Sequence, residues 1–224
     1  MHTLHSYRLD SAQVMPPGST GPSVRCATRA DLPAIVELHA IALPRFFWED
    51  PAPAFLRSFY SFALYDLEGW LFVSQHQGHL AGFVAGFSDP SHLFQRIATH
   101  KLRFFTSVVS CLVGHPIQLP GLLRDTHKAI CLRGEAASCG DAACELVTLA
   151  VEPQFRRQGH GRALVQALVE AARTHQMRQL RVCADIHDRG MGYFYRRLGF
   201  ELFRAFKTPE GKWMDEYVLA IRAE

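Results

Sequence analysis

The sequence has no apolar run of the roughly 18 residues that a membrane-spanning helix needs. It contains six cysteines but no CxxC pair, and the spacing of Cys139 and Cys144 fits no common zinc site. We therefore expect no metal, no membrane span and cysteines that are reduced and mostly buried. Basic and acidic residues almost balance, at a formal net charge of +3, which does not indicate a nucleic-acid partner.

The first residues also lack the basic and apolar regions of a signal peptide, so a cytoplasmic location is the expectation. Residues 1–21 are polar and rich in Pro, Gly and Ser, which predicts a flexible N-terminal arm. The remainder, 22–224, suits a single domain. Its composition, 48% hydrophobic and 20% charged over the whole chain, is ordinary for an enzyme.

Hydrophobic periodicity then predicts a mixed α/β (α+β) sheet with helices packed against it. The expected strands cover 24–27, 70–76, 80–87, 145–150 and 179–186, and two more flank a turn at 209–211. The expected helices begin near Thr28 or Asp31, run over 53–65, follow the turn near residue 160 to about 176, and cover 190–199.

Residues 89–140 interrupt this rhythm and are predicted to form a helical insertion of two or three short helices. Leu102, Phe105, Val109 and Leu112 make one apolar stripe in it. The insertion could be a cap over the sheet, a substrate lid or a dimer contact, so a homodimer stays open. A membrane-surface helix is poorly supported because the polar face is not densely basic.

The candidate functional residues lie between a predicted strand and a predicted helix, in the stretch VEPQFRRQGHGRAL over 151–164. A helix N-terminus presents unpaired N–H groups, glycine lets an anion approach them, and three arginines add positive charge. A phosphate or pyrophosphate is the natural ligand. The P-loop pattern fails because Arg162 and Ala163 follow Gly161, and the dinucleotide fingerprint fails at Leu164.

The hexapeptide from Arg156 to Gly161 instead resembles the Gln/Arg-x-x-Gly-x-Gly/Ala motif of the GNAT superfamily of acyl-CoA-dependent N-acetyltransferases. Three neighbours strengthen the resemblance: the strand with LAVEP, the amphipathic helix after the turn, and YFYRRLGF about thirty residues on. The resemblance covers the chain from about residue 22 to its end, apart from the insertion. It implies a GNAT-like mixed, splayed sheet with helices on both faces.

The resemblance also implies acetyl-CoA as cosubstrate. Its pantetheine arm would bond to the main chain of the strand before the turn, its pyrophosphate would lie on the turn, and the Leu149 N–H would stabilise an oxyanion. The implied cofactor-binding residues are Leu149, Ala150, Val151, Arg156, Arg157, Gln158, Gly159, His160, Gly161, Arg162 and Asp188.

For catalysis, the resemblance offers Glu145 as the base that deprotonates the amine and Tyr195 as the acid for the leaving thiolate. A water chain could replace Glu145, which could instead be a solvent-facing carboxylate, and Tyr195 could be a core aromatic. Asp188 departs from the usual Asn of the family and Met191 from its usual Ala, which puts the contact at Asp188 in doubt. A cysteine mechanism through Cys144 or Cys183 lacks an activating His/Asn arrangement.

These features predict direct acetyl transfer to a primary amine of a small molecule, of the amino sugar or amino acid type, or of a protein. Two alternatives stay open. One is a longer acyl donor, for which Phe104, Phe105 and Leu112 could line a tunnel. The other is a catalytically idle acyl-CoA-binding or interaction module.

Overall fold

The computed structural model describes residues 21–43, 53–65, 69–88, 142–208 and 211–222. In chain order the elements are β1 (Ser23–Cys26), η1 (Arg29–Asp31), α1 (Leu32–Ala42), α2 (Pro53–Tyr65), β2 (Gly69–His76), β3 (His79–Phe87), β4 (Ala143–Val151), η3 (Pro153–Phe155), α6 (His160–Thr174), β5 (Gln179–Asp185), α7 (Arg189–Arg197), β6 (Glu201–Lys207) and β7 (Trp213–Ala220). This order confirms the predicted succession. The predicted insertion at 89–140 and nearly all of the predicted arm at 1–21 lie outside the described residues.

The strands form one seven-stranded sheet in the order β1-β2-β3-β4-β5-β7-β6. Strands β4 and β5 run parallel, and the other five neighbouring pairs are antiparallel. The parallel pair arises because α6 connects β4 to β5, as a parallel crossover requires. The sheet is therefore mixed, as predicted.

Two hydrophobic clusters show that helices cover both faces of the sheet. Helices α1 and α2 pack their buried side chains, among them Ile35 and Tyr60, against one face, which we call the α1–α2 face. Helices α6 and α7 pack Leu164, Leu168 and Tyr195 against the other, the α6–α7 face. Helix α6 packs closely against β3 at Gly86. A Cβ at this position would come within 2.7 Å of Leu168 Cδ1, so the glycine makes the close approach possible.

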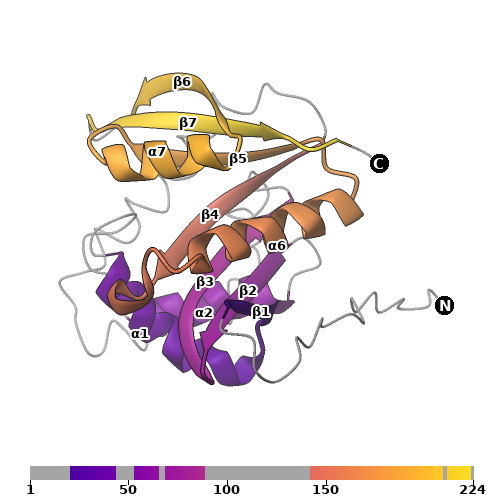
Figure 1. Ribbon diagram of the computed structural model, residues 1–224, viewed down its shortest axis with the longest axis vertical. Helices are drawn as coiled ribbons and strands as arrows, with labels where there is room; N and C mark the ends of the chain where they lie inside the picture. The colour runs from indigo at the N-terminus through magenta and orange to yellow at the C-terminus, as the bar shows by residue number, and fades with distance from the viewer. Residues whose placement is uncertain (1–20, 44–52, 66–68, 89–141, 209–210, 223–224) are drawn as a thin grey trace.

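Strand β4 is paired with β3 over most of its length and with β5 only at its start. All but one of its residues from Glu145 to Val151 have partners on β3, whereas its register with β5 covers only Ala143–Leu146. From Val147 onward β4 runs apart from β5, and Figure 1 shows the two strands diverging toward the starts of α6 and α7. This is the splay that the sequence predicted.

A β-bulge lies where the divergence begins. The register with β3 passes from Ala85 opposite Thr148 to Gly86 opposite Leu146, so Val147 is the extra residue. A bulge bends and twists its strand, which here separates the later half of β4 from β5.

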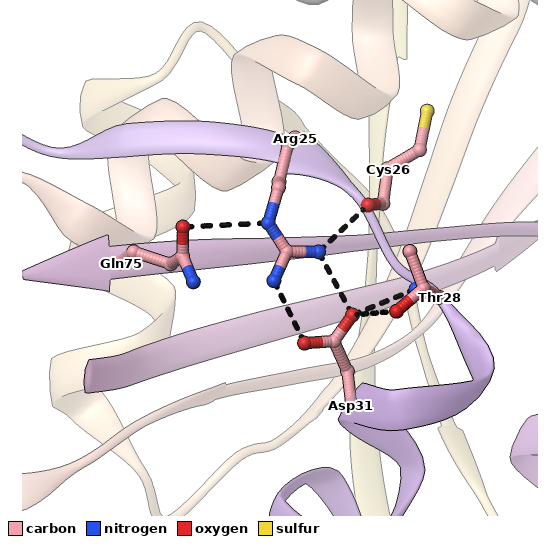
Figure 2. A network of polar contacts seen from close by, with 5 residues as sticks. All are labelled: Arg25, Cys26, Thr28, Asp31 and Gln75. Atoms are coloured by element: carbon pink, nitrogen blue, oxygen red, sulfur yellow. Dashed lines mark hydrogen bonds and ion pairs between the residues drawn. The ribbon is translucent and has the colours of Figure 1, made fainter. Parts of the chain in front are cut away.

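At the start of the first helix, a polar network joins β1, β2 and η1 (Figure 2). Asp31 accepts two hydrogen bonds of 2.8 Å from the Arg25 guanidinium and one of 2.7 Å from the Thr28 N–H. Arg25 also donates to Gln75 on β2. The hydrogen bond from the Arg25 guanidinium is the main cause that lowers the pKa of Asp31 to about 2, so the carboxylate is charged and closes this helix start at neutral pH.

None of the helices in the described ranges has the length and hydropathy that a transmembrane span needs.

Candidate functional site

In the half of β4 that diverges from β5, the main-chain N–H and C=O groups of successive residues point alternately toward β3 and away from it. The N–H of Glu152 donates to the Ala81 carbonyl at 2.9 Å, which continues the ladder with β3. Because ladder bonds alternate along an antiparallel strand, Ala150 and Thr148 also bond toward β3. Leu149 and Val151 therefore direct their N–H and C=O groups away from β3, along the edge that β5 has left, which we call the open edge.

This alternation separates the three predicted main-chain contacts. Leu149 has both main-chain groups at the open edge. Val151 offers its N–H there, since its carbonyl accepts a hydrogen bond of 3.2 Å from Arg156 Nε. Ala150 packs into the core of the α1–α2 face, and its main chain pairs with Phe83, so the predicted cofactor contact at Ala150 is not favoured by this geometry.

The glycine turn after β4 is shaped so that its amides lie together at the start of α6. Arg157 and Gly159 have φ of 64° and 92°, in the left-handed region. Conformations of alternating hand bring successive N–H groups onto one concave side, which binds anions. The first hydrogen bond into the helix runs from the Ala163 N–H to the Gly159 carbonyl at 3.0 Å. The amides of His160, Gly161 and Arg162 come before it and have no partner within the helix.

The N-cap position of α6 is occupied by Gly159, which has no side chain with which to cap the helix. Arg156, Arg157 and Arg162 are exposed around the turn. No described carboxylate forms an ion pair with any of the three. The helix dipole and the arginines thus add to a positive potential at this point.

Gly161 lies between the turn and α7. A Cβ at this position would come within 3.3 Å of the Phe194 ring and 3.7 Å of Val151 Cγ2. Glycine here lets the helix start approach both the end of β4 and helix α7. Gln158 also faces outward, and its amide Nε2 donates to the Gln154 carbonyl at 2.9 Å, which braces the turn.

The side chain of His160 faces the protein interior. Only 1% of the residue is exposed, and its Nδ1 lies 2.7 Å from the Ser74 hydroxyl on β2. Burial, together with the nearby His76, lowers the pKa of His160, so the ring is neutral near pH 7. His160 can therefore offer a phosphate its main-chain N–H, while its side chain anchors the turn to the sheet. Ser74 is not among the predicted site residues. A signal for it exists in the sequence, because it is a polar residue inside the mostly apolar strand GWLFVSQH.

Tyr195 is buried in the core of the α6–α7 face. Its ring packs against Phe194, Phe200 and Tyr217 with centroids 5.3 to 6.0 Å apart. Burial raises the pKa of Tyr195 well above its ordinary value, and the neighbouring Cys183 and Asp188 raise it further. The phenol therefore stays protonated near pH 7 and can act as a hydrogen-bond donor.

Glu145 lies on the opposite face of the sheet from Tyr195. Cys144 and Leu146 on either side of it belong to the α6–α7 core, so strand alternation turns Glu145 toward the α1–α2 face. Its register partners are Phe87 and Arg181, in the half of β4 that is still paired with β5. The two predicted catalytic residues thus approach the diverging strands from different faces.

Asp188 closes the start of α7. Its carboxylate accepts a hydrogen bond of 3.0 Å from the Met191 N–H, so it is the N-cap.

Cys144 has a structural environment. Its Sγ donates to the Gln179 carbonyl at 3.3 Å, and burial raises the pKa of the thiol to about 12. A thiol with this pKa is protonated near pH 7 and is a poor nucleophile. No disulfide involves Cys26, Cys144 or Cys183 in the described part of the chain.

Comparison with known proteins agrees with this geometry. Residues 123–202 match the family model described as acetyltransferase (GNAT) domain. The matched segment includes β4, the glycine turn, α6, β5 and α7. A search of curated proteins finds no match.

Several solved structures share the fold. The ribosomal-protein alanine N-acetyltransferase from Escherichia coli is 15% identical, with 91% of this chain and 96% of that chain covered and a TM-score of 0.56. An N-acetyltransferase from Staphylococcus aureus is 16% identical, with 90% and 99% covered and a TM-score of 0.59. The spermidine/spermine N-acetyltransferase SpeG from Vibrio cholerae is 14% identical, with 90% and 95% covered and a TM-score of 0.56. Residues 123–202 thus match a GNAT acetyltransferase model, and the chain shares the fold of these N-acetyltransferase structures, including a sheet in which β4 and β5 diverge.

Proposed function

We propose that the chain is an acetyl-CoA-dependent N-acetyltransferase that transfers the acetyl group directly to a primary amine of a small molecule, of the amino sugar or amino acid type, or of a protein. The observation that carries this proposal is the uncapped start of α6 directly beside the open edge of β4. One feature suits a pyrophosphate and the other suits an amide-containing arm, and coenzyme A contains both.

The residues present fit the cofactor at both ends. The amides of 157–162 form an anion site that no described carboxylate occupies, and Arg156, Arg157 and Arg162 surround it. Leu149 offers a donor and an acceptor at the open edge, as a neighbouring strand would require. The sulfur of the bound cofactor supplies a thioester, whose carbonyl is open to attack by an amine.

The chain's own groups then divide the work of the transfer. Glu145 accepts the proton that the attacking amine must lose, from the α1–α2 face. The Leu149 N–H donates to the carbonyl oxygen as negative charge develops on it. Tyr195 donates a hydrogen bond to the departing sulfur from the α6–α7 face. A nitrogen–carbon bond would form and the carbon–sulfur bond would break. The amine would lose one proton to Glu145, and the coenzyme would leave as a thiolate that accepts the hydrogen bond from Tyr195.

This arrangement explains why base and acid lie on opposite faces. The amine and the sulfur are on different sides of the carbonyl carbon, so groups that serve them must come from different directions. The raised pKa of Tyr195 also fits its assigned role, because a phenolate would repel the leaving thiolate.

The test is an assay of acetyl transfer from acetyl-CoA across a panel of amino acids, amino sugars, polyamines and peptide N-termini, with coenzyme A binding measured separately. Tyr195→Phe removes only a hydroxyl from a packed ring, so we expect kcat to fall about 10- to 100-fold with the coenzyme A affinity unchanged. Glu145→Gln is expected to give a loss of similar size.

Unchanged kcat in both variants would remove the catalytic assignment. Binding of coenzyme A without acetylation of any amine would favour the idle binding module, and turnover only with long acyl donors would favour the longer-chain enzyme.

A further inference from the structure

Three polar side chains from α1, α2 and β4 are buried together on the α1–α2 face. His39 is 3% exposed, Tyr60 is fully buried, and Thr148 is 4% exposed. None of them has a role in the proposed mechanism. Polar groups at this depth are destabilising unless they are hydrogen-bonded, so their grouping requires an explanation.

The three side chains form a chain of hydrogen bonds. His39 Nδ1 lies 2.6 Å from the Tyr60 hydroxyl, and Thr148 also hydrogen-bonds to Tyr60. Burial lowers the pKa of His39 to about 4, so the ring is neutral near pH 7 and Nδ1 can accept. A tyrosine has one proton to give. When Tyr60 donates this proton to His39, Thr148 must be the donor to Tyr60. The two hydrogen bonds then run in the same direction, from Thr148 through Tyr60 to His39.

This chain ends at the β-bulge of β4. Thr148 directly follows Val147, the residue that has no partner on β3, and directly precedes Leu149. It is therefore the residue through which the bulge is joined to the open edge. Tyr60 on α2 and His39 on α1 connect these two helices to this point of β4 by hydrogen bonds.

We propose that His39, Tyr60 and Thr148 are positioning residues that fix the bulge of β4, and with it the main chain of Leu149 at the open edge. The proposal rests on the proposed function for its effect on catalysis. It makes these residues part of the alignment of the acyl donor, although none of them needs to touch it.

Packing alone does not explain the network. The Tyr60 ring already makes edge contacts with Phe59 and Phe83, at centroid distances of 5.2 and 5.1 Å. A phenylalanine would keep these contacts without a buried hydroxyl. Replacing a whole buried polar network by apolar residues is often neutral or stabilising, whereas removing one member leaves the others unpaired. What the hydrogen bonds add is a single geometry at the bulge.

The test separates stability from positioning with two matched variants. Tyr60→Phe deletes one hydroxyl and leaves His39 and Thr148 unpaired. The triple variant Tyr60→Phe, His39→Leu, Thr148→Val removes every polar member while keeping side chains of similar shape. Ile35→Val, fully buried in the same core, is the control for a small loss of stability away from the network.

Three quantities are measured for each protein: the urea midpoint, kcat and KM for acetyl-CoA, and the hydrogen-exchange rates of the Thr148 and Ala150 amides that flank the open edge. In the triple variant we expect the midpoint to recover toward wild type. We expect its kcat to stay about 10-fold low with KM within about twofold, since a small misplacement of reacting groups is costly. The two amides should exchange faster in both network variants but not in Ile35→Val.

A triple variant that regains both stability and kcat, with wild-type exchange at Thr148 and Ala150, would overturn the proposal and make the network purely structural. Failure of the proposed function looks different, because wild type itself would then acetylate no amine. The exchange rates would still decide whether the network holds the bulge.

Discussion

The helices of this domain begin in two contrasting ways. The Asp188 carboxylate closes α7 by accepting from the Met191 N–H, and Asp31 closes η1 by accepting from the Thr28 N–H. Helix α6 begins at Gly159 with no side-chain cap. A carboxylate at a helix start both satisfies amides and neutralises the dipole, so it competes with any anionic ligand. In contrast to α7, the start of α6 carries no carboxylate that would compete with an anion, which suits the pyrophosphate site that we propose there.

The largest expected effect comes from giving α6 a carboxylate at its N-cap, as α7 has. Gly159→Asp places a negative charge at the anion site, and we expect coenzyme A affinity to fall about 100-fold or more from repulsion of the pyrophosphate. Titration calorimetry measures this. Gly159→Asn is the matched control, since it has the same shape and the same strain at a φ of 92° without the charge. Equal losses in both variants would mean that strain, and not charge, explains the result.

A smaller effect is expected from the opposite change at α7. Asp188→Asn keeps a good N-cap but removes the negative charge, so stability should change by less than about 0.5 kcal/mol. Coenzyme A should bind about threefold tighter at low salt, with the gain lost as salt screens the charge. Weaker binding would instead show that the carboxylate contacts the cofactor.

The smallest effect on the cofactor is expected at Asp31, far along the chain from the glycine turn. Asp31→Asn should leave coenzyme A affinity unchanged while lowering the free energy of unfolding at pH 7 by about 1 kcal/mol, because the charged bonds to Arg25 are lost. The folded-state pKa of Asp31 is lowered to about 2. Its stabilisation is therefore present above about pH 4 and is lost as the pH falls through 2.

Urea unfolding of both proteins across this range should show their difference shrink toward low pH. A difference that is constant from pH 7 to pH 2 would contradict the charged network of Figure 2.

The sequence allowed the prediction of everything that depends on local pattern. The periodicity of apolar residues predicted the order of the described elements, and Gly199, with φ of 91°, ends α7 as expected. Residues 156–161, through the family resemblance, predicted the splay of β4. These features are encoded by neighbours in the chain.

What the sequence could not indicate are contacts between distant residues. Ser74 and His160 are 86 positions apart, and the bulge at Val147 depends on the register with β3. The direction of the His160 side chain, and the role of Tyr60 as a link between α1 and β4, follow from tertiary packing alone. The main-chain groups of β4 alternate between its two sides. Once the pairing with β3 is known, this alternation shows which of Leu149, Ala150 and Val151 can contact a ligand.

The most direct test of the account compares binding of coenzyme A with binding of pantetheine by titration calorimetry with the wild-type protein. Pantetheine has the arm but lacks the pyrophosphate and the 3′-phosphoadenosine attached to it. If the uncapped start of α6 holds the pyrophosphate, pantetheine should bind at least about 100-fold more weakly than coenzyme A. Equal affinity for the two ligands, or no binding of coenzyme A, would contradict the account.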